Sequence, residues 1–159
     1  MSVLIRSVVP GDEPVILTFI EALADYERLR DEAVATVADL TRELFGPNPK
    51  VFCEIAVLDG APAGFALWFY TFSTFQGRHG IWLEDLFVDP SVRGKGIGKA
   101  LLKDLAARCV REGLGRFEWA VLDWNQPSID FYRAQGAIFM DDWRRCRVVG
   151  EALDKLSRS

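Results

Sequence analysis

Two adjacent carboxylates interrupt an otherwise apolar segment in the middle of the chain. Residues 81–88 read Ile-Trp-Leu-Glu-Asp-Leu-Phe-Val, so Glu84 and Asp85 are their only charged members. A carboxylate held on a strand can take a proton from an alkylammonium group, directly or through one water, and so create a nucleophile. Because adjacent strand residues point to opposite faces, we expect the two acids to have different roles. Glu84 would be the base, and Asp85 would have a structural role or would support the residues that contact the amine. The alternative for Glu84, a satisfied carboxylate at a strand edge, is disfavoured by the apolar flanks.

A glycine-rich turn follows this segment. Residues 93–98 read Arg-Gly-Lys-Gly-Ile-Gly and precede a helical pattern, a position where backbone N–H groups and the helix dipole favour an anion. A Walker A loop is excluded, because Arg93 stands where its first Gly is required and Ala100 where Ser or Thr is required. A Rossmann fingerprint is excluded by Lys99, which occupies the position of its third Gly. A turn without any ligand remains the alternative.

Backbone N–H groups of residues 86–88 would stabilise an oxyanion if a bulge or splay left them unpaired.

Tyr132 is the candidate acid. With a pKa near 10 it is protonated at neutral pH, and it lies one helical turn beyond residues 125–128. The alternative for Tyr132 is an aromatic residue of the core, and the alternative for Asn125 is a helix cap.

The periodicity of the chain supplies the elements that must position these residues. Apolar alternation predicts strands, and spacings of three and four residues predict helices. We expect strands over residues 3–8, 51–58, 63–74, 81–88, 117–122 and 143–149, and helices over 12–29, 36–46, 97–113, 125–136 and 150–156. A capping box at Thr36 and Asp39 begins the second helix, Asp12 caps the first, and residues 76–80 form a loop.

This order, β-α-α-β-β-β-α-β-α-β, predicts an α/β fold. A mixed, mostly antiparallel central sheet would be flanked by helices, with one parallel strand–helix–strand crossover. No linker or repeat is visible, so residues 1–159 are expected to form a single domain.

Composition excludes several classes of function. The chain has 159 residues, a net charge of −4 and a pI near 5.1, which argues against binding nucleic acid. No apolar run is long enough for a membrane span and no signal peptide is present, so we expect a soluble, cytoplasmic protein. Cys53, Cys109 and Cys146 are too widely spaced for a zinc site, and His79 is the only histidine. We therefore expect no metal and no disulfide framework.

The turn at residues 93–98 resembles the Arg/Gln-x-x-Gly-x-Gly/Ala signature of the GCN5-related N-acetyltransferases (GNAT), and residues 86–90 are similar to the strand that precedes it. The resemblance implies a GNAT-type fold in which this turn wraps the pyrophosphate of acetyl-coenzyme A.

Three further stretches, residues 23–27, 82–88 and 124–132, resemble the diamine (spermidine/spermine and thialysine) acetyltransferase branch of that family. The resemblance implies Tyr132 as proton donor and a homodimer. It places the cofactor contacts at Leu86, Phe87, Val88, Arg93, Gly94, Lys95, Gly96, Ile97, Gly98, Lys99, Asn125, Gln126, Pro127, Ser128 and Tyr132. It places the amine contacts at Tyr26, Glu27, Glu84, Asp85 and Asp142, with Asp141 as the alternative to Asp142.

The chain departs from that branch in its basic residues, which are Arg28, Arg30, Arg144, Arg145 and Arg147. Cations near an amine site repel a polycation and favour a substrate that carries a carboxylate. The resemblance implies an acetyl-CoA-dependent N-acetyltransferase, and because the motifs contain no thiol to carry the acyl group, we expect direct attack in a ternary complex. Its substrate would be a primary amine of a small diamine-like, polyamine-like or thialysine/lysine-like molecule. A protein or peptide N-acetyltransferase and a non-catalytic acetyl-CoA sensor are the alternatives, and the sensor would not need both Glu84 and Tyr132.

Overall fold

The β-rich segments form one five-stranded sheet in the computed structural model, which describes residues 2–159. The strands, in their spatial order, are β1 (Val3–Ser7), β2 (Phe52–Leu58), β3 (Ala61–Ser73), β4 (Arg78–Val88) and β5 (Phe117–Trp119). Neighbours are antiparallel from β1 to β4, whereas β5 is parallel to β4. The mixed, mostly antiparallel sheet is thus confirmed.

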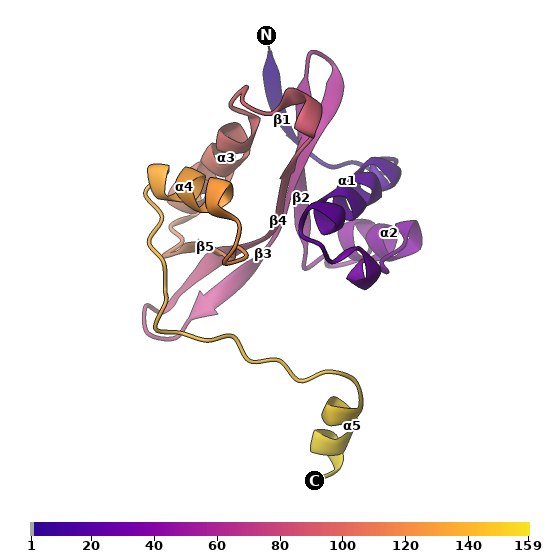
Figure 1. The fold of residues 1–159 in the computed structure, drawn as a ribbon, viewed down its shortest axis with the longest axis vertical. Helices are drawn as coiled ribbons and strands as arrows, with labels where there is room; N and C mark the ends of the chain where they lie inside the picture. The colour runs from indigo at the N-terminus through magenta and orange to yellow at the C-terminus, as the bar shows by residue number, and fades with distance from the viewer. Residues whose placement is uncertain (1) are drawn as a thin grey trace. The chain divides into compact units, whose positions relative to one another are not determined.

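Helices connect these strands and continue beyond them. They are α1 (Glu13–Tyr26), α2 (Val37–Phe45), α3 (Ile97–Glu112), α4 (Gln126–Ala134) and α5 (Gly150–Arg158), with short 3-10 turns η1 (Arg30–Glu32) and η2 (Pro90–Val92). The chain divides into two compact units, the first ending at Ala120 and the second running from Val121 to Ser159. Within the first unit, α1 and α2 lie on one side of the sheet and α3 on the other (Figure 1).

The core of the first unit fixes α1 against β4. Apolar residues of both helices pack on the sheet, namely Ile16, Phe19, Leu40, Leu44, Ile55, Phe65 and Phe87. The ring centroids of Phe19 and Phe87 are 5.6 Å apart. Burying side chains of this size stabilises the fold by about 1.5–3 kcal/mol each, so the C-terminal half of α1 is held beside β4.

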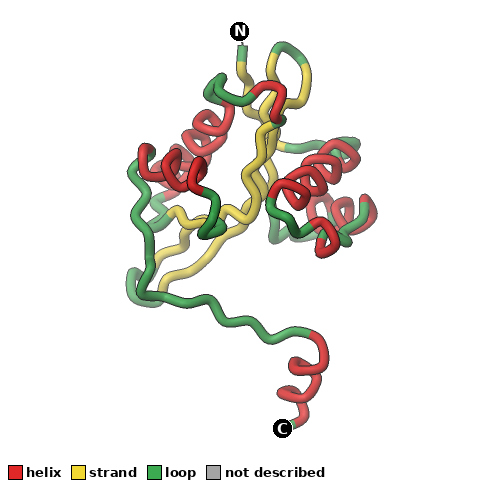
Figure 2. Tube along the Cα trace, in the orientation of Figure 1, coloured by secondary structure: helices red, strands yellow, loops and turns green. Residues whose placement is uncertain are grey.

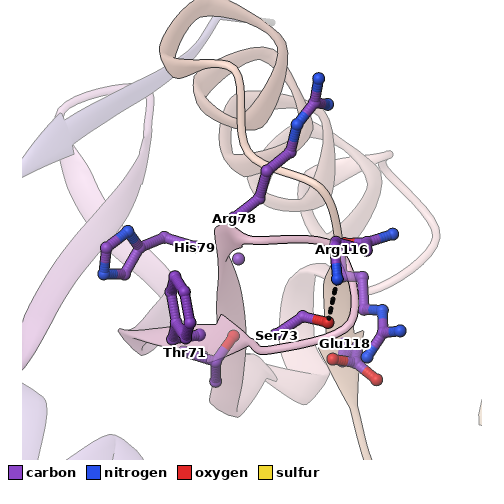
Figure 3. A pocket seen from close by; sticks show the side chains of 9 residues that line it. Thr71, Ser73, Arg78, His79, Arg116 and Glu118 are labelled. Carbon is purple, nitrogen blue, oxygen red and sulfur yellow. Dashed lines mark hydrogen bonds between the residues drawn. The ribbon is translucent and has the colours of Figure 1, made fainter.

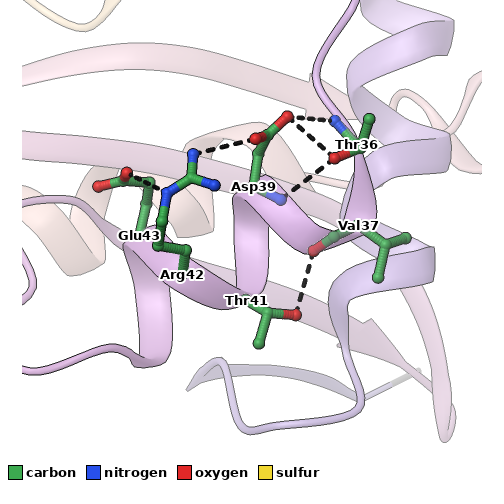
Figure 4. Close-up of polar contacts among 6 residues, drawn as sticks. All are labelled: Thr36, Val37, Asp39, Thr41, Arg42 and Glu43. Atoms are coloured by element: carbon green, nitrogen blue, oxygen red, sulfur yellow. Dashed lines mark hydrogen bonds and ion pairs between the residues drawn. The ribbon is translucent and has the colours of Figure 1, made fainter.

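The capping box of α2 is confirmed. The hydroxyl of Thr36 accepts a hydrogen bond from the backbone N–H of Asp39 at 3.2 Å, and the Asp39 carboxylate accepts one from the backbone N–H of Thr36 at 2.8 Å (Figure 4). Two unpaired backbone donors are thereby satisfied.

The two ends of α1 differ from the expectation. Asp12 precedes the helix but makes no side-chain cap, because its carboxylate accepts hydrogen bonds from the Arg6 guanidinium and from the backbone N–H of Val9. The helix ends at Tyr26, not near residue 29. There Arg28 adopts the left-handed conformation (φ 62°). The N–H of Leu29 donates a 2.8 Å hydrogen bond to the carbonyl of Ala24, five residues earlier, which ends the helix.

The β3–β4 turn is shorter than expected. The loop expected over residues 76–80 is wrong for Arg78, His79 and Gly80, which belong to β4 and pair with residues 71–73 of β3. The hydrogen bonds of a long two-stranded ladder satisfy their backbone, which a loop would leave to water.

Two expected strands are wrong in extent or existence. The strand expected over residues 117–122 ends at Trp119. Residues 143–149 form no strand, because the chain between α4 and α5 is loop (Figure 2). The residues from Asp141 to Val149 are exposed. β-Branched residues such as Val148 and Val149 favour a strand only where a neighbouring strand supplies partners, and none pairs with this segment among residues 2–159.

Candidate active site

An extra residue distorts β4 at the acidic pair. Leu67 of β3 is opposite Asp85, whereas the next residue, Trp68, is opposite Leu83. Glu84 therefore has no partner in the β3 register. This is a β-bulge, which sets two residues of one strand against one of its neighbour and re-aims their side chains.

The bulge gathers side chains on one face of the sheet. Trp82 is opposite Phe69, and Asp85 is opposite Leu67. Phe69 and Leu67 are two residues apart on β3 and so share a face, the one on which Leu67 packs against the α1–α2 core. Oε2 of Glu84 accepts a 2.9 Å hydrogen bond from Nε1 of Trp82. The expectation that Glu84 and Asp85 point to opposite faces is wrong, because the extra residue breaks the alternation.

A third carboxylate, Glu27, follows α1 and completes an acidic cluster with Glu84 and Asp85. Burial, and then the charges of Glu84 and Glu27, raise the pKa of Asp85 to about 7. Burial and the charge of Glu84 also raise the pKa of Glu27. Like charges at close range favour uptake of a proton or a cation, so the cluster suits a positively charged ligand.

Arg93 connects three parts of this site. Its guanidinium carbon lies 5.2 Å from the ring centroid of Tyr26 and 5.8 Å from that of Phe87, both distances typical of cation–π contacts. Its Nε donates a 3.1 Å hydrogen bond to the carbonyl of Val88. The start of the glycine-rich turn is thereby tied to the end of α1 and the end of β4.

Backbone N–H groups accumulate in the glycine-rich turn. Gly94 and Gly96 both have φ of +79°, which glycine adopts without strain, and the space beside them is open. The N–H of Arg93 donates to a carbonyl of η2, and the next backbone N–H that finds a backbone acceptor is that of Ala100. Six consecutive N–H groups, of residues 94–99, have no backbone acceptor within residues 2–159. Together with the α3 dipole they form an arrangement that fits a phosphate or diphosphate.

The edge of β4 next to this turn is also open. β5 pairs with only three residues of β4. The N–H of Asp89 donates to the carbonyl of Ala63, at 2.8 Å, on the β3 side. Because N–H directions alternate along a strand, the N–H of Phe87 faces β3, while those of Leu86 and Val88 face the edge where the described chain has no strand. The early end of β5 thus leaves these two N–H groups without a strand partner in the described chain, as an oxyanion site requires.

The second unit holds the remaining residues that are predicted to contact the cofactor, together with the candidate acid. The side-chain oxygen of Asn125 accepts a 3.4 Å hydrogen bond from the N–H of Ser128, which confirms Asn125 as the cap of α4. The side chain of Gln126 binds that of Asp130 at 2.7 Å. Tyr132 is buried in the following turn of α4, with its ring centroid 5.5 Å from that of Phe131.

Several charged residues expected near the amine are engaged elsewhere or lie in loops. Arg30 pairs with Glu21 at 2.9 Å and with Asp25 at 3.9 Å, so its charge is largely balanced. Asp141 and Asp142 lie in the exposed loop after α4. A substrate contact by either remains a prediction.

Trp82 is the residue that sequence reasoning missed. The sequence signal that could have indicated it is an aromatic residue with a hydrogen-bond donor two positions before Glu84 on the same strand.

A small cavity of about 50 Å³ lies at the opposite end of β4, between Thr71, Ser73, Arg78, Arg116 and Glu118 (Figure 3), and none of the predicted site residues lines it.

No group of three or more His, Cys, Asp or Glu side chains among residues 2–159 is arranged to hold a metal ion. No helix in the same range has the length and apolar character needed to cross a bilayer.

The sheet, the glycine-rich turn and the acidic cluster define the class of protein. Residues 17–137 match the model of the acetyltransferase (GNAT) family, and the chain belongs to that family. It is 37% identical to thialysine N-epsilon-acetyltransferase of Sus scrofa over 98% of both chains. It is 30% identical to L-ornithine N5-acetyltransferase NATA1 of Arabidopsis thaliana, over 97% of this chain and 87% of the relative. A solved integron cassette protein of V. cholerae superposes with a TM-score of 0.82 at 30% identity, covering 100% of this chain and 99% of the other. The protein is an N-acetyltransferase.

Proposed function

We propose that this enzyme transfers the acetyl group of acetyl-CoA to a primary amine of a small basic molecule, by direct attack within a ternary complex. The substrate would be a thialysine-like or lysine-like amino acid, or a diamine-like or polyamine-like molecule. The observation that carries the proposal is the juxtaposition of an acidic cluster with an amide-rich turn. The relatives named for thialysine and ornithine support the choice of a small amine.

The donor would bind along the glycine-rich turn. The N–H groups of residues 94–99 would bind its diphosphate, and the α3 dipole would add to their attraction. Asn125 to Ser128 would contribute from the start of α4. Family membership supports acetyl-CoA as the donor.

Glu84 would prepare the nucleophile. An alkylammonium group has a pKa near 10.4 and must lose a proton before its nitrogen can attack. The Glu84 carboxylate takes that proton, directly or through one water, while Glu27 and Asp85 attract the cation. The nitrogen then forms a bond to the thioester carbon.

Groups on β4 and α4 would complete the transfer. Negative charge develops on the thioester oxygen, where the N–H groups of Leu86 and Val88 would stabilise it. The nitrogen loses its second proton to solvent as the carbon–sulfur bond breaks, and the leaving sulfur takes a proton from the hydroxyl of Tyr132. Glu84 then releases its proton to solvent and Tyr132 takes one up, so that one proton is released overall. The products are an N-acetylated amine and free coenzyme A.

The arginine content favours an amino-acid-like substrate over a long polyamine. Arg28 and Arg93 lie at the end of α1 and on the adjoining turn, and a cation near the site attracts a carboxylate and repels additional ammonium groups. We therefore expect thialysine, lysine and ornithine to be better substrates than spermidine.

The decisive experiment measures thiol release from acetyl-CoA across a panel of these amines, with donor binding measured separately by calorimetry. We expect donor binding and release of one thiol per amine acetylated. Donor binding without release for any amine would identify a non-catalytic sensor instead. Absence of donor binding would remove the basis of the proposal.

We further propose that the protein acts as a cytoplasmic homodimer and that residues of both compact units form one acetyltransferase domain. The family match, which runs from α1 to beyond α4, supports a single functional domain.

A further inference from the structure

The last turn of α1 extends beyond the core that fixes the rest of the helix. The buried residues of α1 are Glu13, Ile16 and Phe19, all in its first half. Tyr26, which ends the helix, is 38% exposed, and Glu27 of the acidic cluster follows it directly. A segment with few buried apolar contacts is the part of a structure that moves most easily. The position of Glu27 therefore depends on the contacts that the exposed end of α1 makes.

The side chain of Arg93 makes such a contact. Its guanidinium carbon lies 5.2 Å from the ring centroid of Tyr26 and 5.8 Å from that of buried Phe87, whose ring packs on the core side against Phe19. Its Nε donates a 3.1 Å hydrogen bond to the carbonyl of Val88. A planar guanidinium stacks on aromatic rings with its face and donates hydrogen bonds from its edge, so these contacts are compatible with one another.

The turn that begins at Arg93 requires a ligand to become fixed. The backbone N–H groups of residues 94–99 find no backbone acceptor within residues 2–159, and the turn contains Gly94 and Gly96, which have the widest choice of backbone conformations. A diphosphate that accepts these N–H groups removes conformational freedom from the turn. Arg93 would be fixed together with it, because it is the first residue of the turn.

We propose that Arg93 is a positioning residue that couples the donor site to the amine site. Donor binding fixes the turn, the turn holds the guanidinium against Tyr26, and Tyr26 holds Glu27 in the acidic cluster. Donor and amine then strengthen each other's binding by the same factor, because coupling between two sites is reciprocal. The inference rests on the proposed function for the identity of the two ligands, and it goes further by assigning their coupling to one side chain.

The charge of Arg93 by itself predicts the opposite result. A cation between the two sites repels an ammonium group, so removing only that charge would strengthen amine binding. Loss of a positioning contact would weaken it. Cadaverine is the appropriate amine for the test, because it has no carboxylate and loss of a contact to a substrate carboxylate therefore has no effect on its binding.

The test is calorimetry of free coenzyme A, which has no acetyl group to transfer, with and without saturating cadaverine. We expect coenzyme A to bind at least about 5-fold more tightly in the presence of cadaverine, and Arg93→Gln to reduce this factor to about one. Lys95→Gln is the matched control, since Lys95 is an exposed cation of the same turn that makes no ring contact with α1 in the described chain. It should weaken the binding of coenzyme A but retain the coupling.

Tyr26→Leu tests the same contact from the other side and leaves the turn unaltered. It should abolish the coupling while the affinity for coenzyme A alone stays unchanged, so the test does not depend on donor binding by Arg93→Gln. Hydrogen exchange provides a readout without amine. The backbone N–H groups of Glu27, Arg28 and Leu29 donate to carbonyls of α1, and coenzyme A should slow their exchange in the unaltered protein. Tyr26→Leu should lose that protection.

Two results overturn the inference: equal affinity for coenzyme A with and without cadaverine in the unaltered protein, or full coupling in Tyr26→Leu. Independent binding of the two ligands in an enzyme that acetylates amines would overturn the inference alone. Failure of the proposed function looks different, since coenzyme A and cadaverine would then be coupled in a protein that releases no thiol from acetyl-CoA. Absence of coenzyme A binding would overturn both.

Discussion

At the scale of single residues, the proposed chemistry divides two proton transfers between Glu84 and Tyr132. Glu84 lies in the first unit on a bulged strand, beside Glu27 and Asp85. Tyr132 lies in the second unit, buried in α4. An acid with a high pKa and a carboxylate are suited to opposite halves of one transfer, because one gives a proton where the other takes it.

Replacing Tyr132 by Phe should lower kcat about 100-fold while the affinity for acetyl-CoA changes little, because only protonation of the leaving sulfur is lost. Steady-state kinetics together with calorimetry would measure both quantities. Tyr70→Phe is the control, since the hydroxyl of Tyr70 binds Glu112 at 2.6 Å and has no role in the proposed transfer. Equal kcat values for Tyr132→Phe and the unaltered enzyme would remove Tyr132 from the mechanism.

Asp85 should leave a signature in stability. Its pKa is raised to about 7 in the folded protein, against about 3.9 in an unfolded chain. Between these pH values the folded state holds more protons, so the free energy of unfolding contributed by this group falls as pH rises from 4 to 7, and the penalty is complete above 7.

We therefore expect Asp85→Asn to gain stability relative to the unaltered protein on going from pH 5 to pH 8, by on the order of 2 kcal/mol in urea unfolding. Asp31→Asn, which removes a carboxylate from the exposed η1 turn, should show no such gain. A pH-independent difference between Asp85→Asn and the unaltered protein would contradict the assignment.

At the scale of elements, two local irregularities build the site. The bulge in β4 gathers Trp82, Glu84 and Asp85 on the α1 side. The early end of β5 leaves an open edge along the rest of β4. The turn into α3 begins just beyond that edge, and the N–H groups of residues 94–99 find no backbone acceptor in the part of the chain that the structure describes. In a regular sheet, a longer β5 would have accepted the hydrogen bonds of the edge N–H groups of β4. Without the bulge, Glu84 and Asp85 would have pointed to opposite faces.

Gly96→Ala should weaken acetyl-CoA binding at least 10-fold in calorimetry, because Gly96 has φ of +79° and an L side chain disfavours that conformation. The N–H groups of the turn would then be displaced from their common direction. Gly60→Ala is a matched control: Gly60 has φ of +87° in the β2–β3 hairpin and an equally open surrounding. Both variants should lose about 1 kcal/mol of stability, but only Gly96→Ala should lose donor affinity.

At the scale of the whole molecule, the second unit carries a loop and a helix with many exposed apolar residues. Trp143 is 73% exposed and Val149 is 63% exposed. Exposed apolar residues of this kind are compatible with the homodimer that we propose.

Sedimentation should give a mass of twice 17.9 kDa for the intact chain. Replacing both Trp143 and Val149 by Ser should weaken that association at least 10-fold, since their burial would favour it by roughly 1.5–3 kcal/mol each. Val110→Ser, at an 84% exposed position on α3, should have no effect. A monomer at all concentrations would contradict the homodimer.

The sequence by itself determined the elements with strong local signals. The Thr36–Asp39 capping box and the cap at Asn125 are confirmed, because each depends on contacts within a few residues. The mixed sheet and the GNAT family also followed from the sequence, through the order of the elements and the turn at residues 93–98.

Only the tertiary structure decided where the strands bulge, end early or do not form. The bulge at Glu84 depends on how β4 pairs with β3, and the length of β5 depends on how far it pairs with β4. Both are pairings between distant parts of the chain, which a local sequence pattern does not predict. The segment 143–149 has a strand-like composition but no pairing partner in the described chain, and β propensity acts through partners. The shared face of Glu84 and Asp85, and the indole that holds Glu84, follow from long-range pairing, which local periodicity does not contain.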